Sequence, residues 1–248
     1  VNEITRNFVP AFFARGVVQI SAYVDQLIAS FLPVGSVSLL FYGQTLTLLP
    51  ISLFGMAISA SELPEMSSDR GDTASAEAHV RKRLQSGVER IAFFVIPSAV
   101  AFLLLGDVIV SALYQRGRFV EADTRFTWGV LAAAAVGLTA SAMARLYSSA
   151  FYALRDTRTP LRIAIVRVTL SGATGWGAAR FLPAALGLEP LWGAAALTLA
   201  SALAGVIEFL FLRARLGQRL APTRGAWRTL VVVWGGAAIA GAATAGLK

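Results

Sequence analysis

Cysteine is absent from this chain of 248 residues, and histidine occurs once, at His79. The lack of cysteine excludes disulfides, cysteine metal sites and thiol catalysis, and a single histidine excludes a zinc site built from histidines of this chain. Charged side chains are also scarce: they make up 15% of the residues, whereas a soluble domain carries about 25%. No apolar run combines paired carboxylates, a nucleophile with its base or a metal cluster, so we do not expect an enzyme.

Hydrophobic residues, by contrast, make up 56% of the chain, and the formal net charge is +8. The arginines collect in short segments between apolar runs, which is the pattern of a membrane protein rather than of a nucleic-acid-binding surface. We therefore expect membrane lipids as partners and no nucleic acid. No cleavable signal peptide is visible, and the chain begins at Val1 rather than Met, which suggests a piece of a longer protein.

The apolar runs are long enough to cross about 30 Å of hydrocarbon, and they predict roughly seven transmembrane helices. The expected fold class is therefore an all-α polytopic membrane protein. Segments such as 91–105 and 130–144 have no charged face, which argues against a soluble bundle. The expected helices cover 9–32, 37–61, 88–111, 126–154, 160–182, 190–212 and 227–247.

A polar stretch at 62–87 interrupts this pattern, with acidic residues followed by the basic cluster Arg81, Lys82 and Arg83. It is too polar to enter the bilayer. We expect a cytoplasmic loop that contains a short amphipathic helix from Ala74 to Leu84, with the basic cluster facing anionic headgroups.

Among the ionisable residues that fall inside apolar runs, three lie away from the ends and need an explanation. Asp25 is the carboxylate placed near the middle of a run; a structural hydrogen bond to a neighbouring helix and a contact with a cation or substrate both remain open. Arg145 lies about 13 Å from the loop that follows its helix, a depth at which a cation is costly. Arg167 is expected to extend its guanidinium to the interface.

Prolines and small residues mark further local features. Pro50 predicts a kink or break in its helix, which either lines a cavity or only aids packing. Pro160 suits the first turn of the next helix, with Thr159 as its cap. Small residues at nearly four-residue spacing in the run 190–212 predict a close helix contact: Gly193, Ala196, Ala200 and Ala204.

The basic residues divide unequally between the two sides of a seven-helix arrangement. The excess predicts that the N-terminus and the turn at 155–159 are cytoplasmic. Glu208, near the end of its run, is expected to pair locally with Arg213 and Arg215. One side receives Arg6, Arg15, Arg81, Lys82, Arg83, Arg155, Arg158, Arg162, Arg213, Arg215, Arg219 and Arg224, and the other Arg116, Arg118, Arg125, Arg180 and Lys248.

Four sequence blocks occur in an order that is specific to one family. They read QISAYVDQLIASFL at 19–32, YGQTLTLLPISLFGMAISASELPEMS at 42–67, LYQRGRF at 113–119 and SAFYALRDTRTPLRIA at 149–164. Together they resemble the MviN/MurJ family of lipid II flippases, within the multidrug, oligosaccharidyl-lipid and polysaccharide exporter superfamily.

The resemblance implies a fold of about fourteen helices in two lobes around a central cavity. The match is to the second lobe, so the chain is expected to be half of a transporter. It would comprise a six-helix bundle over 1–220 and an additional C-terminal transmembrane helix over 221–248. The missing first lobe of the same transporter is then an expected partner, and the location is the bacterial inner membrane.

The resemblance also implies a function, the movement of undecaprenyl-pyrophosphate-linked peptidoglycan precursor from the inner to the outer leaflet by alternating access. Arg145 is then expected as a cavity cation, with Asp25, Gln44 and Thr45 also lining the substrate cavity. Pro50 is expected to act as a hinge. No cofactor is expected, and Na+ and H+ are candidate coupling ions.

Two departures from the family pattern affect the cargo and the coupling ion. Better-known members carry Asp-Arg where this chain has Gln44 and Thr45, which leaves open another polyprenyl-linked glycan or amphiphile as cargo. The family's sodium site would use Asp25 and Thr198, but its positions in the fifth helix are Ser171 and Gly175 here, so we expect an incomplete cation site. A further alternative is a membrane scaffold half that does not transport.

Overall fold

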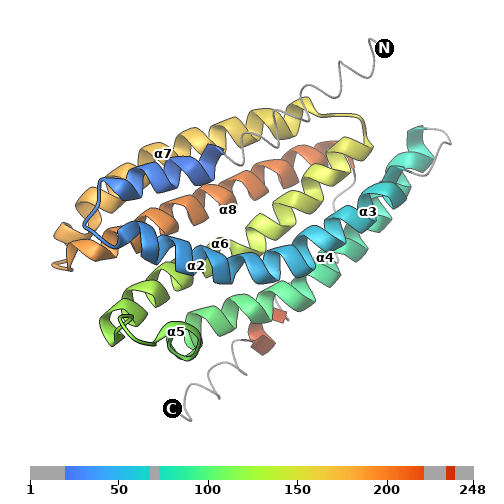
Figure 1. The fold of residues 1–248 in the computed structure, drawn as a ribbon. Helices are drawn as coiled ribbons and strands as arrows, with labels where there is room; N and C mark the ends of the chain where they lie inside the picture. The colour runs from blue at the N-terminus through green and yellow to red at the C-terminus, as the bar shows by residue number, and fades with distance from the viewer. Residues whose placement is uncertain (1–19, 68–72, 221–232, 238–248) are drawn as a thin grey trace.

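The computed structural model describes residues 20–67, 73–220 and 233–237, and within these ranges the chain is all-α (Figure 1). The two longest helices among them are α6 (Glu121–Ala153) and α4 (Thr73–Leu104). α6 lies at the centre of the bundle and packs against α4, α2 (Ser36–Pro50) and α8 (Gly193–Arg219), while α7 (Arg158–Ala185) packs against α8. A helix over 20–30 lies beside α7, where the side chain of Val24 approaches Gly172.

Two apolar clusters hold this arrangement together. The larger joins α4, α6 and the last turns of α8 around residues such as Ile91, Leu146 and Leu212. The smaller joins the helix 20–30 to α2, α6 and α8 around Leu40 and Leu197.

The helix that contains Pro50 changes its hydrogen bonding at this residue. α2 ends at Pro50, a π-helical segment η1 (Ile51–Met56) follows, and α3 (Ala57–Ser67) completes a continuous helical run. Because proline has no N–H to donate within a helix, the regular pattern is interrupted there. The helix is therefore not broken at Pro50; its irregularity is a π segment, a feature that is frequent at functional sites.

The region 62–87 differs from the expected loop. Residues 62–67 continue α3, and residues from Thr73 onward form the beginning of α4, so the helix expected over 74–84 is the first part of a longer helix. Ion pairs fix the two helices to each other, between Arg83 and Glu65 at 2.6 Å and between Arg90 and Glu62 at 3.2 Å. The helix expected over 88–111 is itself divided at Leu105, beyond which α5 (Gly106–Tyr114) begins.

The turn between α6 and α7 is built differently from the sequence expectation. Arg155 adopts a left-handed conformation at φ 58°, while the N–H of Asp156 donates to Phe151 and that of Arg155 to Tyr152, the pattern of a Schellman cap. α7 starts at Arg158, and the carboxylate of Asp156 accepts the N–H and the hydroxyl of Thr159 at 3.0 and 2.8 Å. The N-cap residue is Thr157, and the carboxylate of Asp156, rather than the side chain of Thr159, accepts the hydrogen bonds from the first turn of α7.

Small residues bring α6 and α8 into close contact. A Cβ added at Gly137 of α6 would lie 2.8 Å from the Cα of Ala202 in α8. The predicted small-residue face of α8 is also buried, at Gly193, Ala196, Ala200 and Ala204. Short side chains allow the backbones to approach without voids, which is how membrane helices associate.

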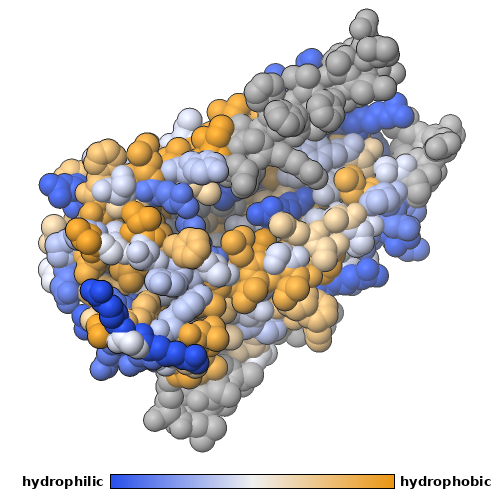
Figure 2. All heavy atoms as spheres, viewed as in Figure 1, coloured by the Kyte–Doolittle hydropathy of each residue, from blue (hydrophilic) through white to orange (hydrophobic). Residues whose placement is uncertain are grey.

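Four helical runs in the described part of the chain are long and apolar enough to span a membrane: Ser36–Ser67, Glu77–Leu104, Glu121–Ala153 and Pro190–Arg219, the last including the short helix η2 (Pro190–Trp192). Hydrophobic residues cover much of the face shown in Figure 2, whereas hydrophilic residues gather towards the two ends and in the middle. The predicted helices over 126–154, 160–182 and 190–212 correspond to α6, α7 and α8. Residues 1–19, and all of 227–247 except 233–237, lie outside the described residues.

Candidate functional site

A hydrogen-bonded group of three side chains joins the helix 20–30, α7 and α8. The hydroxyl of Ser201 lies 3.0 Å from both carboxylate oxygens of Asp25 and donates to them, and it lies 3.3 Å from the hydroxyl of Ser171. Asp25 is 9% exposed and Ser171 is fully buried. Buried polar groups need such partners, so this contact holds three helices in register.

A buried ion pair continues the group along α7 and α8. Arg167 Nη1 lies 3.2 Å from Glu208 Oε2, with side-chain exposures of 20% and 9%. Arg167 precedes Ser171 by four residues, and Glu208 follows Ser201 by seven, so each pair shares one face of its helix. The expected local pairing of Glu208 with Arg213 and Arg215 is wrong, as is the extension of Arg167 to the interface, because the two residues pair across helices.

Arg145 of α6 belongs to the same region. It interacts electrostatically with both Arg167 and Glu208, and its Nε has no hydrogen-bond partner among the described residues. The positive charge of Arg167 also acts on Asp25. We call the six residues Asp25, Arg145, Ser171, Arg167, Ser201 and Glu208 the polar cluster.

The residues predicted for a cation site are only partly brought together. Asp25 and Ser171 meet through Ser201, but the hydroxyl of Thr198 donates to the carbonyl of Ala194 in its own helix. Position 175 is a glycine packed near Leu197 and offers no side-chain oxygen. Ser201 was not predicted; its signal was its position three residues after Thr198, on the same face of the helix.

Two of the predicted cavity residues, Gln44 and Thr45, belong to α2. Thr45 is exposed, and its hydroxyl donates to Phe41 in its own helix. Gln44 is half-buried. No hydrogen bond or ion pair recorded for the described residues joins either side chain to the polar cluster.

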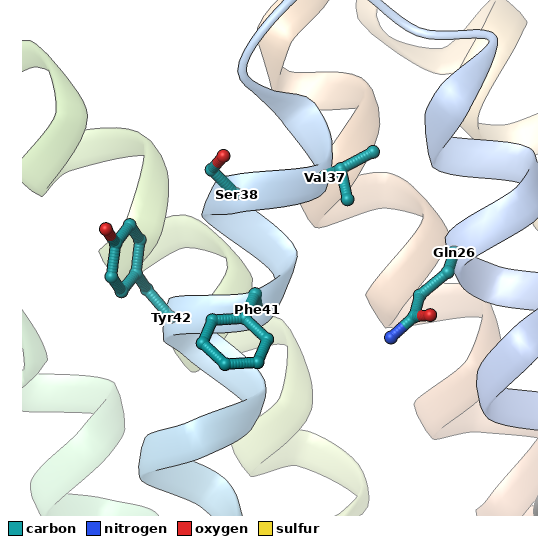
Figure 3. Close-up of a pocket in the computed structure, with 5 residues that line it drawn as sticks. All are labelled: Gln26, Val37, Ser38, Phe41 and Tyr42. Atoms are coloured by element: carbon teal, nitrogen blue, oxygen red, sulfur yellow. The ribbon is translucent and has the colours of Figure 1, made fainter.

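A separate open pocket of about 280 Å³ lies between the helix 20–30 and α2 (Figure 3). Gln26 points into it from the first helix, across from Val37 and Phe41 of α2, and Ser38 and Tyr42 complete its lining. The Tyr42 ring is 4.8 Å from that of Tyr114 and 5.4 Å from that of Phe119, so its orientation is fixed by aromatic packing. The lining residues carry no formal charge.

Within the described residues no group of three His, Cys, Asp or Glu side chains could hold a metal ion. The polar cluster places charged side chains inside an apolar bundle. Charged side chains within spanning helices mark substrate or ion pathways. The fold therefore defines an all-helical, multi-pass membrane protein, and a polar cluster of this kind within spanning helices is typical of transporters.

The comparison with known families is more specific. A family model described as "Lipid II flippase MurJ" matches residues 1–248. The chain belongs to this family, whose members are transporters and not enzymes.

Individual relatives agree with the family match. A probable lipid II flippase of Haemophilus influenzae is 33% identical over 170 residues, which is 67% of this chain and 33% of the relative, and one of Thermotoga maritima is 27% identical over 87% of this chain and 42% of its own length. The chain thus spans about a third to two fifths of these curated relatives.

Solved structures show the same relation. A lipid II flippase MurJ in an inward closed conformation aligns with a TM-score of 0.73 at 27% identity, over 92% of this chain and 46% of that one. A transporter of the MOP superfamily from Pyrococcus furiosus aligns with a TM-score of 0.56 at 14% identity, which shows likeness of fold alone.

Proposed function

We propose that this chain is the second lobe of a lipid II flippase, which moves undecaprenyl-pyrophosphate-linked peptidoglycan precursor from the inner to the outer leaflet by alternating access. The observation that carries the proposal is the family match over residues 1–248. Since the chain aligns with 46% of a solved flippase, the other lobe of the same transporter is its expected partner. The process served would be peptidoglycan synthesis, and with it cell-wall biogenesis and cell shape.

The physical requirement for such a transporter is a hydrated path for a charged headgroup. A pyrophosphate with attached sugars cannot cross hydrocarbon unaided, and rocking of two lobes around a central cavity re-exposes it on the other side. Arginine suits this cargo because its planar fork binds phosphate oxygens at two points. We assign Arg145 to pyrophosphate contact, with Asp25, Gln44 and Thr45 along the same path.

The conformational change needs a point where a helix can bend. Pro50 adjoins the π segment η1, and Gly55 within that segment packs against Ala142 of α6, to which an added Cβ would be 3.2 Å distant. We assign Pro50 as the hinge of this helix.

We further propose seven transmembrane helices in the bacterial inner membrane with residue 1 cytoplasmic: a six-helix bundle over 1–220 and a C-terminal helix over 221–248. Two ion pairs support this sidedness. Arg219 at the end of α8 pairs with Asp156 of the α6–α7 turn at 3.0 Å, and Arg125 pairs with Glu189 at 3.0 Å. Each pair joins two segments that the charge distribution assigns to the same side. α7 is not among the four runs that meet both the length and the hydropathy requirement, but with 28 residues it is about 42 Å long, which is the length needed to cross the bilayer.

The test is complementation of a flippase-depleted bacterial strain by the full-length protein that contains this chain. We expect growth with the wild type, loss of growth with Arg145→Ala, and partial growth with Arg145→Lys, because lysine retains the charge but not the two-point contact. Arg125→Ala at an exposed ion pair is the control and should grow normally. Failure of the wild type to complement despite normal insertion would contradict the proposal.

A second candidate function is the transport of a different polyprenyl-linked glycan or amphiphile by the same scaffold. The residue at position 45, a threonine, favours this alternative. An exposed threonine on α2 replaces the arginine that the family resemblance implies, which removes one cation from the path. Complementation distinguishes the two cargoes: if the correctly inserted wild type does not support growth of the flippase-depleted strain but Thr45→Arg does, the second candidate is favoured, whereas growth with the wild type favours lipid II.

A further inference from the structure

The charges of the polar cluster are balanced without any added ion. Two carboxylates, Asp25 and Glu208, face two guanidiniums, Arg145 and Arg167, so the formal charges sum to zero. The Arg167–Glu208 pair is direct, at 3.2 Å, and Arg167 also acts electrostatically on Asp25. Charged groups inside a membrane bundle are tolerated when they compensate one another, so the described residues already meet this condition.

A resident sodium ion does not fit these residues. Hard cations require several oxygen ligands, yet the hydroxyl of Thr198 is directed to Ala194 and Gly175 offers none. Both oxygens of Asp25 already accept the hydroxyl of Ser201, and Glu208 is engaged by Arg167. A bound monovalent cation would also give the group a net charge of +1 beside two guanidiniums, which a low-dielectric interior disfavours.

We propose that Arg167 is a built-in cation: its guanidinium supplies, from α7, the positive charge that holds the helix 20–30, α7 and α8 together, so this lobe needs no bound sodium ion for its packing. Arg167 is suited to the role by its position, because it lies one turn before Ser171 on α7. Ser171 contacts Ser201 of α8, which in turn donates to Asp25 of the helix 20–30. A guanidinium keeps its charge under all working conditions. The inference does not depend on the cargo.

The experiment measures thermal unfolding of the full-length protein in detergent at pH 8, in sodium chloride and in choline chloride of equal concentration. The wild type should unfold at the same temperature in both salts. Arg167→Gln leaves two carboxylates against one guanidinium, so it should acquire a sodium-specific stabilisation of roughly 2–4 °C. Arg167→Lys and the double variant Arg167→Gln with Glu208→Gln keep the charges balanced and should show no sodium-specific shift.

Two results would overturn the inference. One is a sodium-specific shift in the wild type that disappears in Asp25→Asn, since the site would then bind sodium as it stands. The other is a folded Arg167→Gln protein that gains no response to sodium. If Arg167→Gln does not fold, the wild-type comparison with Asp25→Asn decides alone. Because the readout is stability and not transport, failure of the flippase assignment would leave this result unchanged.

Discussion

The side chains of Glu208 and Glu189 each form one ion pair but differ in burial. The Glu208–Arg167 pair is 9% and 20% exposed, whereas the Glu189–Arg125 pair is 60% and 55% exposed. We expect Glu208→Gln to destabilise the protein by about 3–5 kcal/mol, because it leaves the guanidinium of Arg167 buried without its counter-charge. The matched control Glu189→Gln should cost less than about 1 kcal/mol. If Glu208→Gln and Glu189→Gln lost the same free energy of unfolding in detergent, the burial of the Arg167–Glu208 pair would be contradicted.

Asp156 makes stability depend on pH at the α6–α7 turn. Partial burial raises the pKa of its carboxyl, but the hydrogen bonds from Thr159 and the charge of Arg219 lower this pKa by more, so it lies below its ordinary value. A lowered folded-state pKa adds stability that is present above the unfolded-state pKa and is lost as pH falls through the folded-state value.

Asp156→Asn tests this dependence. At pH 7 we expect the variant to be less stable than the wild type by about 1 kcal/mol. The difference should shrink as the pH falls below about 4, where the wild-type carboxyl takes up its proton. Unfolding temperatures measured across this range give the result. A difference that stays constant with pH would mean that the charge of Asp156 does not contribute.

The contact between α6 and α8 depends on one glycine. A Cβ at Gly137 would lie 2.8 Å from both the Cα and the Cβ of Ala202 and 2.9 Å from its carbonyl oxygen. Because the backbone cannot yield as a side chain does, Gly137→Leu should destabilise the protein by about 1–3 kcal/mol or more. Gly217→Ala in α8 is the control: nothing lies within 4 Å of its Cβ, so it should raise stability by up to about 1 kcal/mol.

Pro50 is the proposed hinge of the helical run Ser36–Ser67. Pro50→Ala restores a backbone donor, which should straighten the helix and leave stability equal or higher. If bending at this point is part of transport, complementation of a flippase-depleted strain should fall while protein levels stay normal. Pro97→Ala, in α4 without a neighbouring π segment, should complement fully. Full complementation by Pro50→Ala would remove the hinge role.

For the whole molecule, the test is sidedness in the membrane. The 248 residues contain no cysteine, so single cysteines can report exposure in a full-length background freed of other cysteines. Arg118→Cys should react with a membrane-impermeant maleimide in intact spheroplasts, and Arg158→Cys only after permeabilisation. The two residues flank α6, since Arg118 precedes its first turn and Arg158 begins the next helix, α7. Labelling of both from outside would contradict the orientation inferred from the arginine distribution.

The helices were the most predictable part of this protein. Continuous apolar runs locate α6, α7 and α8 with ends that differ from the expected ones by at most seven residues, because a membrane requires length and hydrophobicity before any specific contact. The boundary at Leu105 and the helical extension of α4 back to Thr73 were not predicted. A short amphipathic helix was expected over 74–84, but this stretch is continuous with the following apolar helix, and an ion pair between Arg83 and Glu65 joins it to the preceding helix α3.

The candidate site was predictable only in part, and for a related reason. Asp25 and Arg145 stand out because an ionised side chain in an apolar run is costly. Ser201 does not stand out, since a serine among alanines is common in a spanning helix. Glu208 was matched to its neighbours in sequence, whereas its partner Arg167 lies on another helix.

Composition and the order of four motifs by themselves determined that this chain is an all-helical membrane protein of the MurJ family. Length and hydrophobicity are properties of each segment by itself, so they can be recognised in the sequence without knowledge of any tertiary contact. Only the tertiary structure decided which charges meet: Arg167 with Glu208, and Asp25 with Ser201. Partners on different helices are brought together by packing at positions such as Gly137, and no local pattern encodes that distance.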